Sequence, residues 1–245
     1  TAETLIGLLK SRWQTPVSDG NLLKAKDLLF NWNHQLAPES IAATIYTTWE
    51  SQLKRALYQQ FVPKNIQPYF RTLPTKRLTD WLITPRPDMG SDPVKARDEL
   101  LFQTLHASLD TITKRLGADM AQWQYGQPKN KHITLKHALN DWVDDAQRAR
   151  INLGPLPRGG YGETVNNTGG NLNQEHGASF RILIDTEDWD KTLGINSPGQ
   201  SANPDDPHYR DLFELWAKND YFPVYFSKDK IKVVADQVYQ LRPKP

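Results

Sequence analysis

The residue pattern of this chain changes at Gly117. Before it, apolar residues recur every three or four positions, the spacing of helices that bury one face. The clearest stripe follows Asp92-Pro93, a cap and a favoured first helical position, and runs to Leu116. After Gly117, short apolar segments alternate with turns rich in Gly, Pro and Asn. The pattern predicts an α+β chain with a mainly helical region at 1–117 and a mixed α/β region at 118–245.

Three further helices are predicted in the first region. The segment after Thr1, AETLIGLL, suits a helix start, and Asn21 is a candidate cap for a stripe that ends at Trp32. Apolar residues at every fourth position from Ile41 to Leu57 predict a helix that begins near Pro38. Five prolines between 62 and 90 exclude a long uninterrupted helix there.

The second region contains shorter predicted elements. Thr134 is a candidate cap for a helix that continues to Val143, and Ser179–Asp185 alternates as a strand does. The segment 231–241 fits either a strand or a helix followed by a strand. Four tryptophans lie on the apolar faces of predicted helices and are predicted core residues: Trp32, Trp49, Trp142 and Trp216.

Composition excludes several classes of function. The 30 basic and 28 acidic residues give a net charge of +2, so no large field favours nucleic acid. No apolar run approaches the roughly 18 residues that span a bilayer. The absence of Cys excludes disulfides and thiolate sites. His132 and His137 are five apart and share no helical face, while the carboxylates at 185–190 and 205–206 lack an EF-hand pattern. We therefore predict no metal and no cofactor in this chain.

The segment 177–226 carries the most specific motif. It reads GASFRILID, then a loop with Gly199-Gln200-Ser201 and Pro207-His208-Tyr209, then a Leu-Trp helix and YFP. In this order and wording it resembles the C-terminal end of the catalytic (beta) subunit in the penicillin acylase (penicillin amidase) family of N-terminal-nucleophile (Ntn) hydrolases.

Upstream motifs continue the resemblance in matching order. The segment WQYG at 123–126, followed by two histidines, resembles the family's W-x-W/Y-G…H…H element. The segment GPLP at 154–157 and GGYGETVN at 159–166 are similar to its GP-x-P…GG-x-x-x-TVN element. The likeness covers most of the chain, and it is most specific over 123–226.

The resemblance implies a fold and a function. The helical half and the strands would complete the family's αββα sandwich, in which two sheets lie between helices. The chain would be the C-terminal part of an amidohydrolase that cleaves an acyl-amide bond with an N-terminal Ser outside this chain. Its partners would be the alpha chain, the nucleophile-bearing beta segment and a small-molecule amide. Periplasmic or secreted location is implied, and any calcium would be held mainly by the absent sequence.

Three positions are candidates for chemistry. Thr1 could act as a nucleophile with its own amine, but the residues after it predict a helix, whereas the family's nucleophile opens a strand. Ser201 lacks the final Gly of a nucleophile elbow, so the six motif residues Gly199, Gln200, Ser201, Pro207, His208 and Tyr209 are interpreted as structural. Asp185 is the one catalytic-support candidate, because some acylases similar to this family place an acid there. The competing interpretation is a carboxylate that caps the next turn.

The alternative function is a non-catalytic binding or interaction module built on the same fold. A fragment of an enzyme should expose an apolar sheet edge and self-associate without its complement. An independent module should be a well-behaved monomer. The sequence leaves the acyl group open, because the acyl pocket depends on residues elsewhere.

Overall fold

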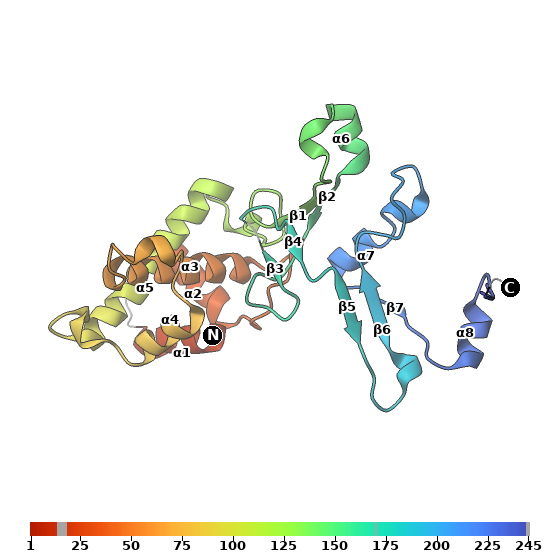
Figure 1. Cartoon of the computed structure of the whole chain (residues 1–245). Helices are drawn as coiled ribbons and strands as arrows, with labels where there is room; N and C mark the ends of the chain where they lie inside the picture. Colours follow the sequence, from red (N-terminus) through yellow and green to blue (C-terminus); the bar gives the residue numbers. More distant parts are fainter. Residues whose placement is uncertain (14–18, 170, 244–245) are drawn as a thin grey trace. The chain divides into compact units, whose positions relative to one another are not determined.

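The computed structural model describes residues 1–13, 19–169 and 171–243. These residues form two compact units. The first comprises Thr1–His132 and Pro157–Gly160, and the second comprises Ile133–Leu156 and Tyr161–Pro245. The mixture of helices with small antiparallel sheets confirms the α+β class (Figure 1). The division predicted at residue 117 stays a prediction.

The first unit is helical. Its α-helices are α1 (Ala2–Arg12), α2 (Gly20–Phe30), α3 (Ile41–Phe61), α4 (Thr75–Ile83) and α5 (Pro93–Leu116). Of the 3-10 helices in this unit, η1 (Gln67–Tyr69) and η2 (Pro87–Met89) lie between α3, α4 and α5, and η3 (Met120–Gln122) follows α5. The proline-rich stretch holds only short helices, as its sequence predicted.

Helices α3 and α5 pack together at the centre of this unit (Figure 1). Trp49 of α3 is fully buried, and its indole nitrogen donates to Leu101 O and Thr104 Oγ1 of α5, each at 3.1 Å. The indole therefore fills the interface and satisfies its own polar atom there. Both predicted stripes supply this core, and Trp32 lies partly buried against it.

The helix ends agree with the sequence in part. Asp92 caps α5 through Lys95 N at 3.0 Å, and Gly117 follows the helix with φ +94°, as predicted. The cap predicted at Asn21 is wrong, because Asp19 accepts from Asn21 N and Leu22 N. Helix α3 begins at Ile41 rather than near Pro38, since Ser40 caps it.

The second unit contains short strands and helices. Its strands are β1 (His132–Leu135), β2 (Leu153–Pro157), β3 (Thr168–Gly169), β4 (His176–Gly177), β5 (Phe180–Leu183), β6 (Leu193–Asn196) and β7 (Phe222–Pro223). Its helices are α6 (Asp145–Ile151), α7 (Phe213–Lys218) and α8 (Lys228–Val234), with 3-10 turns η4 (Asn140–Trp142), η5 (Trp189–Lys191) and η6 (Pro207–Tyr209). β1 and β2 pair, β3 and β4 pair, and β5, β6 and β7 form an antiparallel sheet.

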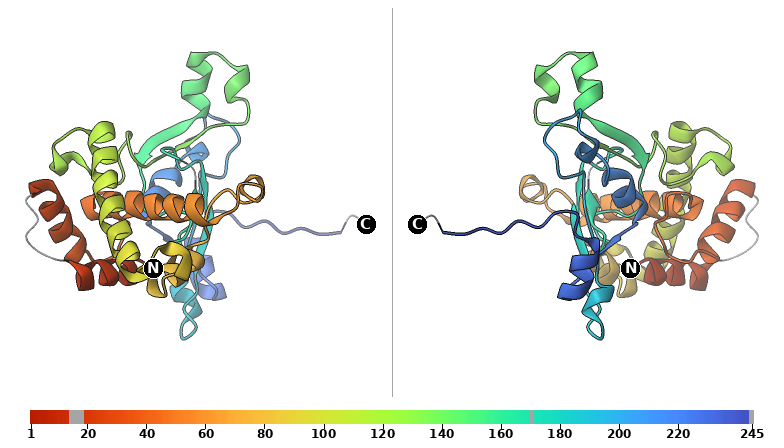
Figure 2. Two further views of the ribbon diagram at one scale, coloured as in Figure 1. Left: turned by 90° about the vertical axis from the view of Figure 1, so that its left-hand side faces the viewer. Right: turned by 90° about the vertical axis from the view of Figure 1, so that its right-hand side faces the viewer.

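The helix predicted from Thr134 to Val143 does not form. Thr134 lies in β1, where its backbone N–H donates to Asn173 Oδ1 at 2.7 Å and its carbonyl accepts from Asn173 Nδ2 at 3.0 Å. The amide side chain thus satisfies both backbone groups of a strand residue. Trp142, predicted to lie in the core, is 84% exposed. Figure 2 shows α6 beyond the end of the β1–β2 pair.

The two C-terminal predictions meet different outcomes. The strand predicted at Ser179–Asp185 is observed as β5, which is shorter. The segment 231–241 begins inside α8, and no strand follows it among the residues described up to 243. Asp190 holds the start of this helix, because its Oδ1 accepts from Phe226 N at 2.8 Å and Ser227 N at 2.9 Å.

Candidate functional site

The six motif residues predicted at 199–209 lie in one closed loop between β6 and α7. Backbone N–H groups of Gln200 and Ser201 both donate to the carbonyl of His208, at 2.8 and 3.1 Å. A Cβ on Gly199 would lie 2.2 Å from that same carbonyl oxygen, so the close approach of the two strands of the loop requires glycine. Pro207 is the first residue of the turn η6, which contains His208.

Side chains inside the loop form successive turns. Ser201 Oγ accepts from Asn203 N at 3.2 Å, and Asn203 Oδ1 accepts from Asp205 N at 3.1 Å. Asp206 Oδ1 accepts from His208 N at 2.8 Å. These bonds are those of turn-forming residues, and in them Ser201 Oγ serves as an acceptor within the loop.

His208 faces a carboxylate. Its Nδ1 lies 2.7 Å from Asp211 Oδ2 at the surface. The hydrogen bond to Asp211 raises the pKa of His208, and the charges of Asp211 and Asp206 add to the effect. The partner of this histidine is therefore a carboxylate three residues further along the chain.

Tyr209 anchors the loop to the second unit's core. It is 7% exposed, and its hydroxyl donates to Ile151 O at 2.7 Å. It shares an apolar cluster with Ile195 of β6 and with Phe213 and Trp216 of α7. The loop is therefore anchored to the core of this unit.

Asp185 has the geometry of a turn cap. Its Oδ1 accepts from Glu187 N at 2.9 Å and Asp188 N at 3.0 Å. These two backbone bonds lower the pKa of Asp185, which therefore stays ionised. Both hydrogen bonds that its carboxylate makes to described residues come from backbone amides, so no histidine of the described chain is held by it. The catalytic-support role remains a prediction for the assembled enzyme.

The sheet β5-β6-β7 has one covered and one uncovered face. Arg181 pairs with Ile195 across the strands, and α7 covers this side. Arg181 donates to Trp216 O and Asn219 Oδ1, and its guanidinium lies 5.2 Å from the Trp216 ring centre. Partial burial lowers its pKa, although an arginine stays charged. The sequence analysis assigned Arg181 no role. The only sign of its importance in the sequence was a charged residue inside the otherwise apolar strand motif.

The uncovered side is apolar. Strand register places Phe180, Ile182 and Phe222 on the same side, at 60%, 42% and 37% exposure. We call these three residues the open sheet face. Among the described strands, none pairs with the outer edge of β5. An apolar sheet face beside an unpaired strand edge has the character of an interaction surface.

The upstream motifs meet within the first unit. Trp123 and Tyr125 are buried, and the Tyr125 hydroxyl donates to Gly160 O at 2.7 Å. Gly126 N donates to Pro38 O at 2.6 Å, and Gly160 N donates to Leu36 O at 2.9 Å. The WQYG and GG segments are thus joined through the loop before α3.

Two charged side chains are buried in the same unit as this junction. Arg158 is fully buried and Glu50 is 2% exposed. Burial raises the pKa of Tyr125, the charge of Glu50 adds to this rise, and Arg158 opposes it. The phenol therefore remains a neutral donor to Gly160, which is a structural role.

Two other sequence candidates bond to backbone groups close to them in the chain. Thr1 is exposed at the start of α1, where its carbonyl accepts from Leu5 N at 2.9 Å. His137 Nδ1 accepts from Leu139 N at 3.1 Å. In the described part of the chain, no group of three or more His, Asp or Glu side chains could hold a metal ion. No described helix has the length and apolar character needed to cross a membrane.

Comparison with known proteins finds acylases among the relatives of this chain. The chain is 26% identical to the acyl-homoserine lactone acylase QuiP of Pseudomonas aeruginosa, over 57% of this chain and 18% of that protein. It is 25% identical to penicillin acylase 2 proenzyme of Pseudomonas sp. strain SE83, over 99% of this chain and 32% of that protein. The chain therefore spans less than a third of the length of these relatives.

A solved structure shares the fold. A thermostable penicillin G acylase from Alcaligenes faecalis superposes with a TM-score of 0.50 at 17% identity, over 98% of this chain and 46% of that chain. The penicillin amidase family model matches residues 1–233, nearly the whole sequence. The motifs, the fold and this match together show that the chain belongs to the penicillin amidase family.

Proposed function

We propose that this chain is the C-terminal part of a penicillin acylase-like amidohydrolase, and that the complete enzyme hydrolyses an acyl-amide bond. The observation that carries the proposal is a family match over residues 1–233 in a chain that spans only 18–32% of two acylase relatives. The nucleophile would be an N-terminal Ser on polypeptide outside this chain, with its own amine as base.

The role of this chain follows from its surfaces. Backbone hydrogen bonds hold the loop at 199–209 closed, and α7 packs against one side of the β5-β6-β7 sheet. The open sheet face and the free edge of β5 would receive the remainder of the enzyme, so that the apolar side chains become the core of an αββα sandwich. Burying them would contribute about 25 cal/mol per Å² of apolar area to the assembly.

Other features of the complete enzyme are parts of the same proposal. One relative is named a proenzyme, which supports release of the nucleophile by processing of a precursor. On the resemblance to the family, we also propose a periplasmic or secreted location. The cysteine-free composition permits this location but does not identify the compartment. Calcium, if the enzyme uses it, would be held mainly by the remainder.

A direct test measures turnover of a chromogenic acyl-anilide. The 245-residue chain alone should show none, and co-production with the remainder bearing an N-terminal Ser should give activity. Replacement of that Ser by Ala should remove activity, while Thr1→Ala should leave it unchanged. Turnover by the isolated chain that is lost in Thr1→Ala would contradict the proposal.

The alternative, a non-catalytic interaction module, makes the opposite prediction for solution behaviour. With its open sheet face uncovered, the isolated chain should self-associate under our proposal. A monodisperse monomer in sedimentation, with no complementary polypeptide in the native preparation, would favour the module.

A further inference from the structure

The excursion between β1 and β2 presents an exposed tryptophan on an ordered support. Trp142 is 84% exposed and Leu139 is 53% exposed. Both lie at the turn η4, just before α6. Tryptophan is enriched at interfaces, and a tryptophan beside a leucine makes an apolar knob.

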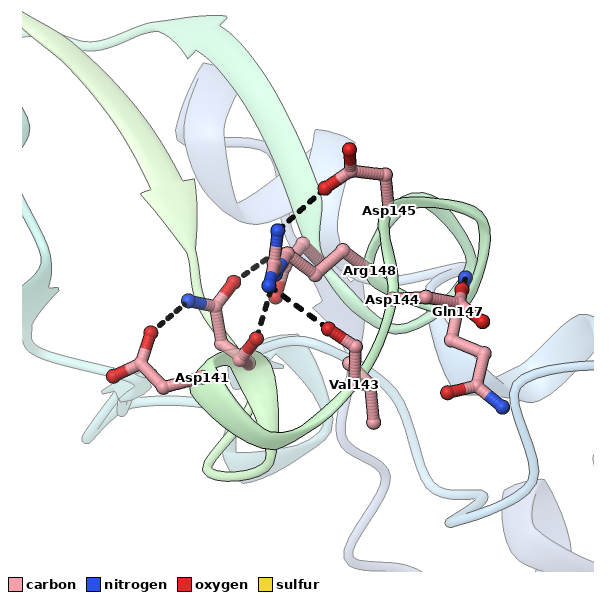
Figure 3. Close-up of polar contacts among 8 residues, drawn as sticks. Asp141, Val143, Asp144, Asp145, Gln147 and Arg148 are labelled. Carbon is pink, nitrogen blue, oxygen red and sulfur yellow. Dashed lines mark hydrogen bonds and ion pairs between the residues drawn. The ribbon is translucent and has the colours of Figure 1, made fainter.

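One arginine holds this turn in shape. Arg148 of α6 donates from Nε to Asn140 O at 2.7 Å and from Nη2 to Val143 O at 2.8 Å. Its Nη1 pairs with Asp145. Figure 3 shows the guanidinium between Val143 and Asp145, with the turn folded around it. The carbonyls on both sides of Trp142 are thereby fixed by one planar, five-donor group.

The base of the excursion is fixed as well. Asn152 Nδ2 donates to Asn140 Oδ1 at 2.7 Å. The Arg150 guanidinium contacts both oxygens of Asp205 at 2.6 Å, and Tyr209 donates to Ile151 O. These side-chain bonds therefore link the base of the excursion to the loop at 199–209. None of these polar contacts buries Trp142, so the network orders the turn that presents it.

Order of this kind favours binding. A turn whose backbone is already held in place loses little conformational entropy when a partner covers it. Tryptophan is among the residue types that dominate binding free energy when they enter an apolar pocket. The surrounding charge then indicates what kind of pocket is compatible.

The knob is flanked by three carboxylates, Asp141, Asp144 and Asp145, of which only Asp145 pairs with Arg148. This charge repels phosphate groups and anionic lipid headgroups. A symmetric contact with a second copy would bring the same carboxylates together, which is unfavourable. A basic rim around an apolar pocket on a different polypeptide is complementary.

We infer that the knob formed by Leu139 and Trp142 docks in an apolar pocket with a basic rim on the N-terminal remainder of the same enzyme. The inference rests on the proposed function. It is supported by the amount of polypeptide outside this chain, since this chain covers 18% and 32% of two relatives. It adds a contact separate from the open sheet face, because the knob projects from the β1–β2 pair instead of from β5-β6-β7.

The test uses the complex of this chain with its remainder, purified by co-production and a tag on the remainder. Trp142→Ala should raise the dissociation constant by roughly tenfold or more. Arg148→Ala keeps the tryptophan but removes its support, and it should weaken the complex too, mainly through faster dissociation. Asp141→Lys should weaken it as well, and the loss should diminish at high salt.

The matched control is Tyr69→Ala, because Tyr69 is 81% exposed in the first unit and plays no part in the knob. It should leave the dissociation constant unchanged. Unaltered affinity in Trp142→Ala, with circular dichroism like the wild type, would refute the inference and leave the proposed function standing. Absence of any wild-type complex would instead refute the proposed function. Self-association that Trp142→Ala abolishes would assign the knob to a second copy and overturn our choice of partner.

Discussion

Replacing Gly199 by alanine tests whether the motif loop depends on a close backbone contact. The new Cβ would lie 2.2 Å from His208 O and 2.8 Å from Tyr209 C, both backbone atoms. Real Cβ contacts are essentially never under 3.0 Å, so the two strands of the loop must separate by roughly 0.8 Å. The bond from Gln200 N to His208 O, now 2.8 Å, would then exceed hydrogen-bonding distance.

The expected size follows from the bonds that are lost. The N–H groups of Gln200 and Ser201 share the His208 carbonyl, and each bond contributes about 0.5–1.5 kcal/mol. Gly199→Ala should therefore destabilise the loop by about 1–3 kcal/mol. Native-state hydrogen exchange of these two amides should accelerate by about 5- to 150-fold.

Gly162→Ala is the matched control, because a Cβ there meets no atom within 4 Å. It should leave exchange at Gln200 and Ser201 as in the wild type. Equal exchange in the Gly199 and Gly162 variants would refute the argument that the motif glycine is required by close approach.

Three other predictions concern single side chains. Gly7→Ala should stabilise the first unit by about 0.5–1 kcal/mol in urea unfolding, because Gly7 lies inside α1 and a Cβ there meets nothing within 4 Å. Lower stability would show that the site is not open. The proton resonances of His208 should titrate above the ordinary histidine pKa, and Asp211→Asn should move the midpoint down. Because the pKa is raised by folding, the stabilisation from this pair is complete below the unfolded pKa and is lost as pH rises through the folded one. An unchanged midpoint would contradict the pairing. Asp190→Ala should expose α8 to protease, since the carboxylate accepts from the two amides before that helix. Folding lowers the pKa of Asp190, so wild-type protection should be present above the unfolded pKa and be lost as pH falls through the folded one. Protection that does not vary with pH would argue against this anchor.

Local sequence predicted the elements whose residues interact with near neighbours. Helix α5 has its stripe, its cap Asp92 and its terminal Gly117 within one continuous segment, and all three were readable. Asp19 was missed in favour of Asn21 because both are good caps and lie two residues apart. The strand at 180–183 was predicted by alternation alone.

The misplaced segment is 134–143. Its apolar residues have helical spacing, but Asn173 bonds both backbone groups of Thr134 and holds it in a strand. Arg148 then folds the following residues into a tight turn. Both partners are side chains whose bonding to this segment leaves no periodic trace, and tertiary contacts override weak helix propensity. Trp142 consequently lies in solvent.

The sequence by itself determined the helical stripes, the α+β class and the order of motifs that places the chain in its family, because each is encoded by neighbouring residues. Only the tertiary structure decided which side of the β5-β6-β7 sheet is covered, that six motif residues close one loop, and that Trp142 stands on an arginine-held turn. The covered side of the sheet depends on a pairing between residues far apart in the chain, Arg181 with Asn219. The loop and the turn depend on specific bonds over a few residues, Gln200 to His208 and Arg148 to Asn140. Such pairings form only after the chain has folded, and residue spacing does not encode them.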